Sequence, residues 1–477
     1  MKIAHIGWEI HPDKKAGGLY EVIYNLSLSQ SKLFNDYSVS VIGPYGGEKR
    51  VISEQVTPNL QYVYINSFQP RENVWGLEGK LYQLTGIRSD AIDNLEKEKR
   101  APDWVKMYRE VITFGKFSSD YVKNMDPDIL HVHDWLDAII LPFSRESGLK
   151  SKKLFHVHST EKGRTDGYPD PTIFEIEKNA CHEADAVITV SKNMVDEIQH
   201  LFGIERSKIN VAYNGIDPQK FNPEVNAKLR PYWRDFILEL AGWKEPVKLV
   251  GFISRLEFAD IKGFKTLIEA ASKVHNSCPN TKFVFVCGPK KQTKSNESLV
   301  DIETLRKNGH VFKIDNGLQQ DRFNKIKEVG LGGNVLWFNC MLDKNSLEAI
   351  LNKYNYCGEI PSKEDPKRGI YAACDLFAFP STYEPFGIVA SEAMGMGKPV
   401  VGCEGTGIHE QIKYGGGIAC KPRDSNSLAN CLIDVLTDDV LYEQLSENAS
   451  KSVKKKFTWD AVARDVDRIY QKVLSKK

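Results

Sequence analysis

The sequence predicts an α/β protein built from two doubly wound parallel sheets in series. Short runs rich in β-branched and aromatic residues recur along the chain, helical patterns separate them, and the alternation breaks once, around residues 222–246. Short apolar strands that alternate with helices are typical of right-handed βαβ units and parallel sheets. At 477 residues the chain is also too long for one ordinary core, which favours two or three domains.

The apolar runs locate the expected strands. The first series comprises residues 2–7, 38–43, 60–65, 129–133, 154–158, 186–190 and 209–213. The second series comprises residues 247–253, 282–287, 334–338, 376–379 and 400–403. Each run is short and is followed by a turn signal or a helical pattern, as expected for buried strands of a parallel sheet.

The break between the two series predicts the domain boundary. It contains Asn-Pro-Glu, a Trp-containing helical piece and Lys-Glu-Pro. We therefore expect an N-terminal Rossmann-like domain over residues 1–230 and a C-terminal one over residues 246–456. The amphipathic stretch 457–477 predicts a closing helix that packs back on the N-terminal domain. The cleft between two such domains is the expected ligand site.

Composition narrows the classes of function. Lys and Arg number 64 against 63 Asp and Glu, so no strong overall field indicates a nucleic-acid partner, and any basic site must be local. The nine cysteines form no Cys-x-x-Cys pair, which favours reduced thiols over a disulfide framework or a zinc site. The sequence starts directly with a strand and contains no apolar stretch near the ~20 residues that span a bilayer. We expect a cytoplasmic protein without a membrane span.

A strand-to-helix junction carries two carboxylates eight positions apart, Glu384 and Glu392. The apolar run 376–379 precedes it, and a small-residue helix can begin near Gly387. Glu384 would lie at the carboxyl end of a strand, where open parallel sheets bind ligands. Backbone N–H groups near Gly387 could meet an anion there. Two surface glutamates at this spacing are the alternative, but the surrounding Pro-Phe-Gly favours a functional site.

Two further loops could bind phosphate. The first βα turn contains Lys15 and the glycine pair that ends at Gly18, so the backbone can approach a ligand closely, although a simple tight turn explains the glycines equally well. This loop is neither a Gly-x-Gly-x-x-Gly motif nor a P-loop, so neither a nicotinamide cofactor nor ATP hydrolysis is indicated. After the first strand of the second series, Arg255 and Lys262 flank a loop. An Arg fork together with a Lys point charge suits a diphosphate. We favour this interpretation over a pair of exposed surface cations.

Histidines form two His-x-His pairs, at 131–133 and 156–158. In strands each pair points to one face, which a metal hydrolase could use, but a catalytic metal would need further ligands that only chance would supply. We expect no metal, and instead predict that His158 bonds a polyhydroxyl substrate with Asp134 near the cleft. Asn214, in a sharp Asn-Gly turn, would face the same cleft.

Taken together, these segments resemble the nucleotide-sugar glycosyltransferases of the GT-B fold, and within them the glycogen and starch synthases. The resemblance rests on the order of six segments: Lys-x-Gly-Gly-Leu at 15–19, His-Asp-Trp at 133–135, His158, Asn-Gly-Ile-Asp at 214–217, Arg255 with Lys262-Gly, and Glu-Pro-Phe-Gly with Glu-x7-Glu at 384–392. It implies two Rossmann-like domains that face each other across a deep cleft. It also implies transfer of glucose from UDP- or ADP-glucose to the non-reducing end of an α-1,4-glucan, with retention of configuration and without a metal or cofactor.

The resemblance implies a role for each site residue. Arg255 and Lys262 would bind the leaving diphosphate, Glu384 would lie beside the donor sugar, and Glu392 would hold the ribose. His158 would contact the transferred sugar, and Lys15 and Gly18 would contact the phosphates. The backbone of Phe386 and Gly387 would bind sugar hydroxyls or phosphate. Asp134 and Asn214 would help to shape the site near the acceptor.

The sequence leaves several points open. The loop from Arg255 to Lys262 is one or two residues longer than is usual in the family, which could re-aim Lys262. Another GT-B transferase that makes a disaccharide, glycoside or glycolipid is the main alternative. A non-catalytic glucan-binding protein and a metal-dependent hydrolase are the others. The residues that recognise the base, the oligomeric state and the role of residues 70–120 are not assigned.

Overall fold

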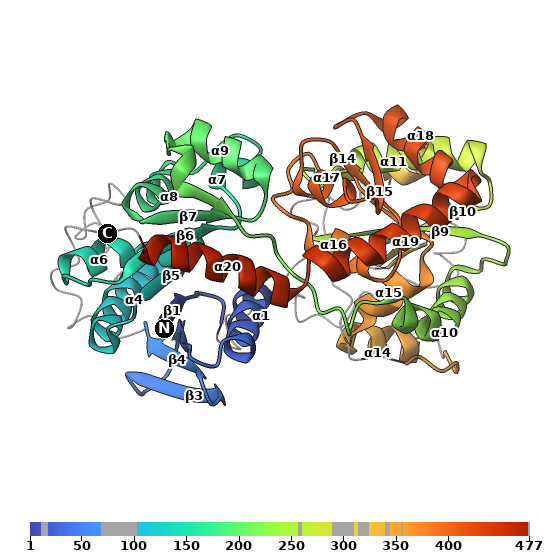
Figure 1. Cartoon of the computed structure of the whole chain (residues 1–477). Coiled ribbons are helices and arrows are strands. Elements are labelled where there is room, and N and C mark those ends of the chain that lie inside the picture. The colour runs from blue at the N-terminus through green and yellow to red at the C-terminus, as the bar shows by residue number, and fades with distance from the viewer. Residues whose placement is uncertain are drawn as a thin grey trace. The chain divides into compact units, whose positions relative to one another are not determined.

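The computed structural model describes residues 1–10, 18–67, 103–255, 260–288, 310–312, 324–338, 344–353, 356–361, 363 and 365–475. The chain divides into two compact units, unit 1 with Met1–Asn214 and Trp459–Lys477, and unit 2 with Gly215–Thr458 (Figure 1). The first segment of unit 1 thus ends at Asn214, whereas the sequence predicted the end of the N-terminal domain at residue 230. The reason is that helix α10 (Pro223–Ala241), in the expected boundary region, packs on α15 (Pro366–Ala373) of unit 2.

Unit 1 contains an eight-stranded sheet in the order β3-β4-β2-β1-β5-β6-β7-β8. All neighbouring strands are parallel except β3 and β4, which are antiparallel. The strands are β1 (Lys2–Ile6), β2 (Ser38–Tyr45), β3 (Val51–Thr57), β4 (Leu60–Asn66), β5 (Ile129–His133), β6 (Lys152–Val157), β7 (Ala186–Thr189) and β8 (Ile209–Val211). The strand order reverses between β1 and β5, and such a switch point is where open α/β sheets bind ligands at the carboxyl ends of the strands.

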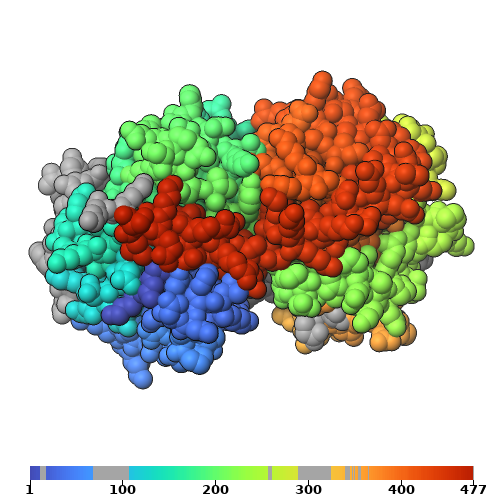
Figure 2. Space-filling model, in the orientation of Figure 1, coloured from blue at the N-terminus to red at the C-terminus, as the bar shows by residue number. Residues whose placement is uncertain are grey.

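Helices cover this sheet (Figure 1). They are α1 (Gly18–Leu33), α4 (Asp103–Met125), α5 (Asp134–Ala138), α6 (Ile140–Glu146), α7 (Glu161–Arg164), α8 (Pro171–Glu183), α9 (Lys192–Phe202) and α20 (Trp459–Leu474). Asp170 caps the start of α8 and Ser191 caps the start of α9, because each side chain accepts backbone N–H groups of the first turn. The amphipathic α20 buries one apolar face and packs against α1. In Figure 2 it lies in dark red over blue and green segments of the same unit.

Unit 2 contains a fully parallel seven-stranded sheet in the order β11-β12-β10-β9-β13-β14-β15. The strands are β9 (Lys248–Arg255), β10 (Thr281–Gly288), β11 (His310–Phe312), β12 (Val335–Phe338), β13 (Leu376–Phe379), β14 (Val400–Cys403) and β15 (Gly417–Cys420). Its other helices are α11 (Phe264–Ser277), α14 (Lys344–Lys353), α16 (Ile388–Gly395), α17 (Gly407–Ile412), α18 (Ser425–Thr437) and α19 (Asp439–Lys456). Here the switch point lies between β9 and β13.

The predicted α/β fold with two parallel, Rossmann-like sheets is confirmed. No helix among the described residues combines the length and the apolar character that crossing a membrane requires.

Candidate active site

The centre of the candidate site in unit 2 is an ion pair between Lys262 and Glu384. Lys262 Nζ lies 2.7 Å from Glu384 Oε2, although the two residues are 122 positions apart in the chain. Their side chains are only 22% and 12% exposed. Ser381 Oγ donates to the same carboxylate oxygen at 3.4 Å. The two residues that the sequence predicted separately for the diphosphate and the sugar are therefore in direct contact.

A backbone hydrogen bond and a close backbone contact join the loops that carry this pair at the switch point. Lys262 follows β9 and Glu384 follows β13, which is the neighbouring strand. The backbone N–H of Thr382 donates to the carbonyl of Ile261 at 2.7 Å. Gly263 has φ +74, and a Cβ there would lie 2.0 Å from the Pro380 carbonyl oxygen. Only glycine combines this left-handed conformation with so close an approach.

Arg255 is the last residue of β9 and pairs in register with Gly288 of β10. Its side chain is half-buried at the carboxyl edge of the sheet. The structure therefore places Arg255 on the edge that also carries Lys262 and Glu384, while the intervening residues 256–259 lie outside the described part of the chain.

Glu392 lies in α16 and is held by two residues of α15. Lys367 Nζ lies 2.7 Å from Oε1, and the Tyr371 hydroxyl donates to Oε2 at 2.7 Å. Burial, together with the Glu392 carboxylate, raises the pKa of Tyr371 well above its usual value. Sequence reasoning missed both partners, because the segment before β13 gave no register that would align Lys367 and Tyr371 with α16.

Hydrogen bonds from Gln411 of α17 hold the Pro-Phe-Gly turn. Gln411 Nε2 donates to the carbonyls of Phe386 at 2.5 Å and Gly387 at 3.2 Å, and Ser391 Oγ donates to Gln411 Oε1 at 2.7 Å. Gly387 has φ +89 and precedes the first residue of α16. These bonds hold the turn in place, and a Cβ at Gly387 would lie 3.1 Å from Glu384 Cγ, so α16 begins beside Glu384.

In unit 1, Asp134 and His158 meet at the carboxyl ends of β5 and β6. Asp134 Oδ1 accepts the backbone N–H of His158 at 2.7 Å. Asp134 itself has φ +57 and opens α5. The carboxylate therefore positions the backbone of His158 rather than its imidazole. This contact brings together two residues that the sequence predicted near the same cleft.

The remaining predicted residues are less informative. Gly18 is the first residue of α1, and Asn214 is the last residue of the first segment of unit 1. Lys15 lies outside the described residues.

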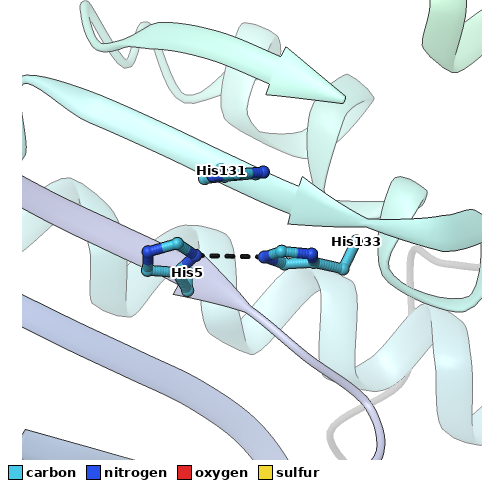
Figure 3. Close-up of side chains that lie close together, drawn as sticks. All are labelled: His5, His131 and His133. Atoms are coloured by element: carbon cyan, nitrogen blue, oxygen red, sulfur yellow. Dashed lines mark hydrogen bonds between the residues drawn. The ribbon is translucent and has the colours of Figure 1, made fainter. Parts of the chain in front are cut away.

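The two His-x-His pairs lie side by side at β5 and the end of β6. His5 of β1 lies next to His131 and His133 (Figure 3). The rings of His5, His131 and His133 are fully buried. Burial lowers the pKa of His5 to about 4 and the pKa of His131 and His133 far below the usual value, so these imidazoles are neutral at pH 7. His5 was not predicted as a site residue, because a single histidine in a strand carries no spacing signal.

Comparisons with known proteins agree with this geometry. Residues 86–220 match the family Glycosyltransferase Family 4, and residues 329–452 match the family Glycosyl transferases group 1. The first range includes Asp134 and His158, and the second includes Glu384 and Glu392. A glycogen synthase of Mycobacterium tuberculosis is 25% identical over 98% of this chain and 94% of its own length. An uncharacterized glycosyltransferase of Methanocaldococcus jannaschii is 27% identical over 72% of this chain and 75% of its own.

Solved structures show the same architecture. A sucrose-phosphate synthase from Thermosynechococcus elongatus aligns over all of both chains with a TM-score of 0.67 and 18% identity. The catalytic domain of starch synthase IV from Arabidopsis thaliana, bound to ADP and acarbose, aligns over 100% of this chain and 99% of its own with a TM-score of 0.65 and 17% identity. From its family matches and its fold, the chain is a glycosyltransferase of the GT-B fold that resembles the glycogen and starch synthases.

Proposed function

We propose that this glycosyltransferase moves glucose from UDP- or ADP-glucose to the non-reducing end of an α-1,4-glucan, with retention of configuration. The observation that carries the proposal is the Lys262–Glu384 pair at the switch point of unit 2. It sets a cation suited to a leaving diphosphate against a carboxylate suited to sugar hydroxyls. The glycogen synthase relative, which matches nearly the whole chain, and the starch synthase structure with ADP and acarbose support this substrate class.

In the proposed reaction, the acceptor hydroxyl oxygen forms a bond to the anomeric carbon on the face from which the diphosphate leaves. The bond between that carbon and the phosphate oxygen breaks, and the departing phosphate takes the proton of the acceptor. Lys262 and Arg255 stabilise the negative charge that develops on the diphosphate, and the partial positive charge at the N-terminus of α16 adds to this stabilisation. Glu384 contacts the donor sugar and also holds Lys262 in place before the donor binds.

Glu392 would bind the ribose of the nucleotide. Lys367 and Tyr371 hold its carboxylate in one orientation, so it meets a ligand without first losing side-chain freedom. In unit 1, His158 would contact the transferred sugar. The proposal requires no metal, because Lys262 and Arg255 supply the positive charge that a divalent cation supplies in other diphosphate sites.

A transferase with another acceptor is the second candidate. It is favoured by the structural likeness to a sucrose-phosphate synthase and by a mannosylfructose-phosphate synthase of Agrobacterium fabrum that is 25% identical over 76% of this chain. A sugar phosphate is the acceptor class that these two names suggest.

The test is release of nucleoside diphosphate from UDP-glucose and ADP-glucose in the presence of a chelator, with and without glycogen. Glycogen-dependent release by the parent, and its loss in Glu384→Ala, would support the proposal and identify the donor. Release that glycogen does not stimulate would move the assay to fructose 6-phosphate and other sugar phosphates. Release from neither donor would refute the glucan-synthase proposal, and a requirement for added metal would refute the metal-free mechanism.

A further inference from the structure

A hydrogen-bonded histidine network crosses the core of unit 1 and ends at His158. Its five rings come from three adjacent strands, with His5 on β1, two histidines on β5, and His156 and His158 at the end of β6. The network is anchored on two helices by Gln30 of α1 and Tyr470 of α20. A buried array of this size is costly unless its groups are hydrogen-bonded, so the pattern of its protons is constrained.

The first branch runs from Gln30 to His158. Gln30 Oε1, an acceptor, faces His5 Nε2 at 2.8 Å, so this nitrogen carries the proton of the neutral ring. His5 Nδ1 is then an acceptor, and His133 Nε2 donates to it at 3.0 Å (Figure 3). By the same reasoning His133 Nδ1 accepts, and His158 Nε2 donates to it at 3.1 Å.

The second branch begins at the other end of the same amide. Gln30 Nε2 donates to the Tyr470 hydroxyl at 3.2 Å, and this hydroxyl donates to His131 Nδ1 at 2.6 Å. His131 Nε2 then donates to His156 Nδ1 at 3.2 Å. A single amide therefore orients both branches, with protons pointing toward Gln30 in the first and away from it in the second.

Each branch leaves one buried ring nitrogen at its far end. Among the described residues, His158 Nδ1 and His156 Nε2 have no hydrogen-bond partner. The proton positions above make His158 Nδ1 a bare acceptor and His156 Nε2 a donor. An acceptor without a partner at the carboxyl edge of the sheet is a group to which a ligand hydroxyl can donate.

We propose that Gln30, through His5 and His133, fixes the tautomer of His158, so that His158 presents an unprotonated Nδ1 to a hydroxyl of the substrate. The tautomer follows from the network alone, whereas its use toward a sugar hydroxyl rests on the proposed function. Gln30, His5 and His133 are positioning residues, because they act through His158. Burial lowers the pKa of His158 below its usual value, which keeps the ring neutral, as the tautomer requires.

A metal in the same cluster fits less well. Ligand atoms of His5, His131 and His133, and of His133, His156 and His158, lie within 4.8 Å of one another. However, each set contains two pairs of rings with nearly parallel planes, and one pair in each set has especially close centroids. The ring planes of His131 and His133 are 14° apart with centroids at 4.3 Å, and those of His156 and His158 are 27° apart with centroids at 4.1 Å. Nitrogen lone pairs lie in the ring plane, so stacked rings aim them past each other rather than at one ion.

The test is nitrogen NMR of the full chain labelled with 15N-histidine at pH 7.5, with the His158 signals assigned by their loss in His158→Asn. We expect a protonated Nε2 and an unprotonated Nδ1 for His158. A protonated Nδ1 would overturn the proposal without any further variant. Addition of zinc under the same conditions should leave the ring signals unchanged, and zinc-dependent shifts of several rings would show that the cluster is a metal site instead.

Variants then test the role of Gln30. Gln30→Met removes the acceptor for His5, and we expect the His158 signals to show a mixture of tautomers. We also expect kcat/KM to fall about tenfold, the factor that corresponds to the loss of one hydrogen bond. His156→Asn is the control, because it alters an equally buried ring of the second branch and leaves Gln30, His5 and His133 in place. It should keep the His158 tautomer. A Gln30→Met protein that is less stable but retains the tautomer would show that Gln30 has only a structural role.

The substrate part has its own readout. A glucose nucleotide that donates a hydroxyl to His158 should move the Nδ1 signal and leave its protonation state unchanged. If neither UDP-glucose nor ADP-glucose moves the signal while the tautomer is as expected, the proposed donor is refuted. The inference that the histidine network fixes the tautomer of His158 is then retained.

Discussion

Replacement of Glu384 by Gln should have opposite effects on binding and on turnover. In the free protein, Glu384 holds Lys262 at 2.7 Å, so a diphosphate must compete with this carboxylate for the lysine. The pair is mostly shielded from solvent, with side chains 12% and 22% exposed, which places its worth near the upper end for partly exposed pairs, about 1 kcal/mol. Glu384→Gln removes that competition, and 1 kcal/mol corresponds to about fivefold tighter binding of UDP or ADP.

Turnover should fall over the same substitution. If Glu384 contacts the donor sugar in the transition state, loss of one preorganised charged group costs about 10²–10³ in kcat. Tighter product binding and slower chemistry together distinguish this role from a general loss of structure, which would weaken binding as well.

The assay is calorimetric titration of UDP and ADP into the parent, Glu384→Gln and Glu392→Gln, together with kcat for each. Glu392→Gln is the matched control, because the same change is made on the same junction, but the lost ion pair is with Lys367. We expect weaker nucleotide binding there. Equal weakening by both variants would refute the competition argument, and full turnover in Glu384→Gln would refute the contact with the donor sugar.

Two further predictions concern stability. Gly263→Ala should destabilise the protein by about 2 kcal/mol or more and lower kcat/KM, because the left-handed backbone at φ +74 and the Pro380 carbonyl oxygen 2.0 Å from the new Cβ would displace the Lys262 loop. Gly330→Ala is the control, since with φ +76 and no atom within 4 Å of its Cβ it should cost only about 1 kcal/mol. Equal losses of stability in urea unfolding would contradict the steric explanation. Burial lowers the pKa of Lys398 to about 7 from 10.5, so between these pH values the unfolded chain holds an extra proton and the free energy of unfolding rises with pH. In Lys398→Met, thermal unfolding at pH 7 and pH 9 should show a smaller rise of this free energy than in the parent. An unchanged rise would show that Lys398 does not titrate in this window.

The pattern of apolar runs was sufficient to predict the fold, because most strands are buried and short. It did not predict β3, whose residues Val51–Thr57 are half-exposed or exposed and which pairs antiparallel at the edge of the sheet. It also did not predict β15 (Gly417–Cys420), a half-buried run of four residues without a strong apolar signal.

The positions of the candidate residues relative to the strands could be predicted from the sequence, but their contacts could not. The position of Lys262 after β9 and of Glu384 after β13 could be read from the chain. Their ion pair depends on β9 and β13 being neighbours, which only the strand order decides. The same holds for His5, which meets the predicted histidines because β1 pairs with β5.

Unit 1 is assembled from two stretches of chain that are separated by the whole of unit 2. During synthesis, the contiguous unit 2 is complete before α20 emerges, and domains generally fold as they become complete. The core of unit 1 must therefore wait for residues that are made after all of unit 2, and the Tyr470 hydroxyl, which orients His131, is among them. Residues 1–214 produced alone would contain every strand of the first sheet yet lack the helix that closes it, whereas residues 215–458 have all the parts of their own core.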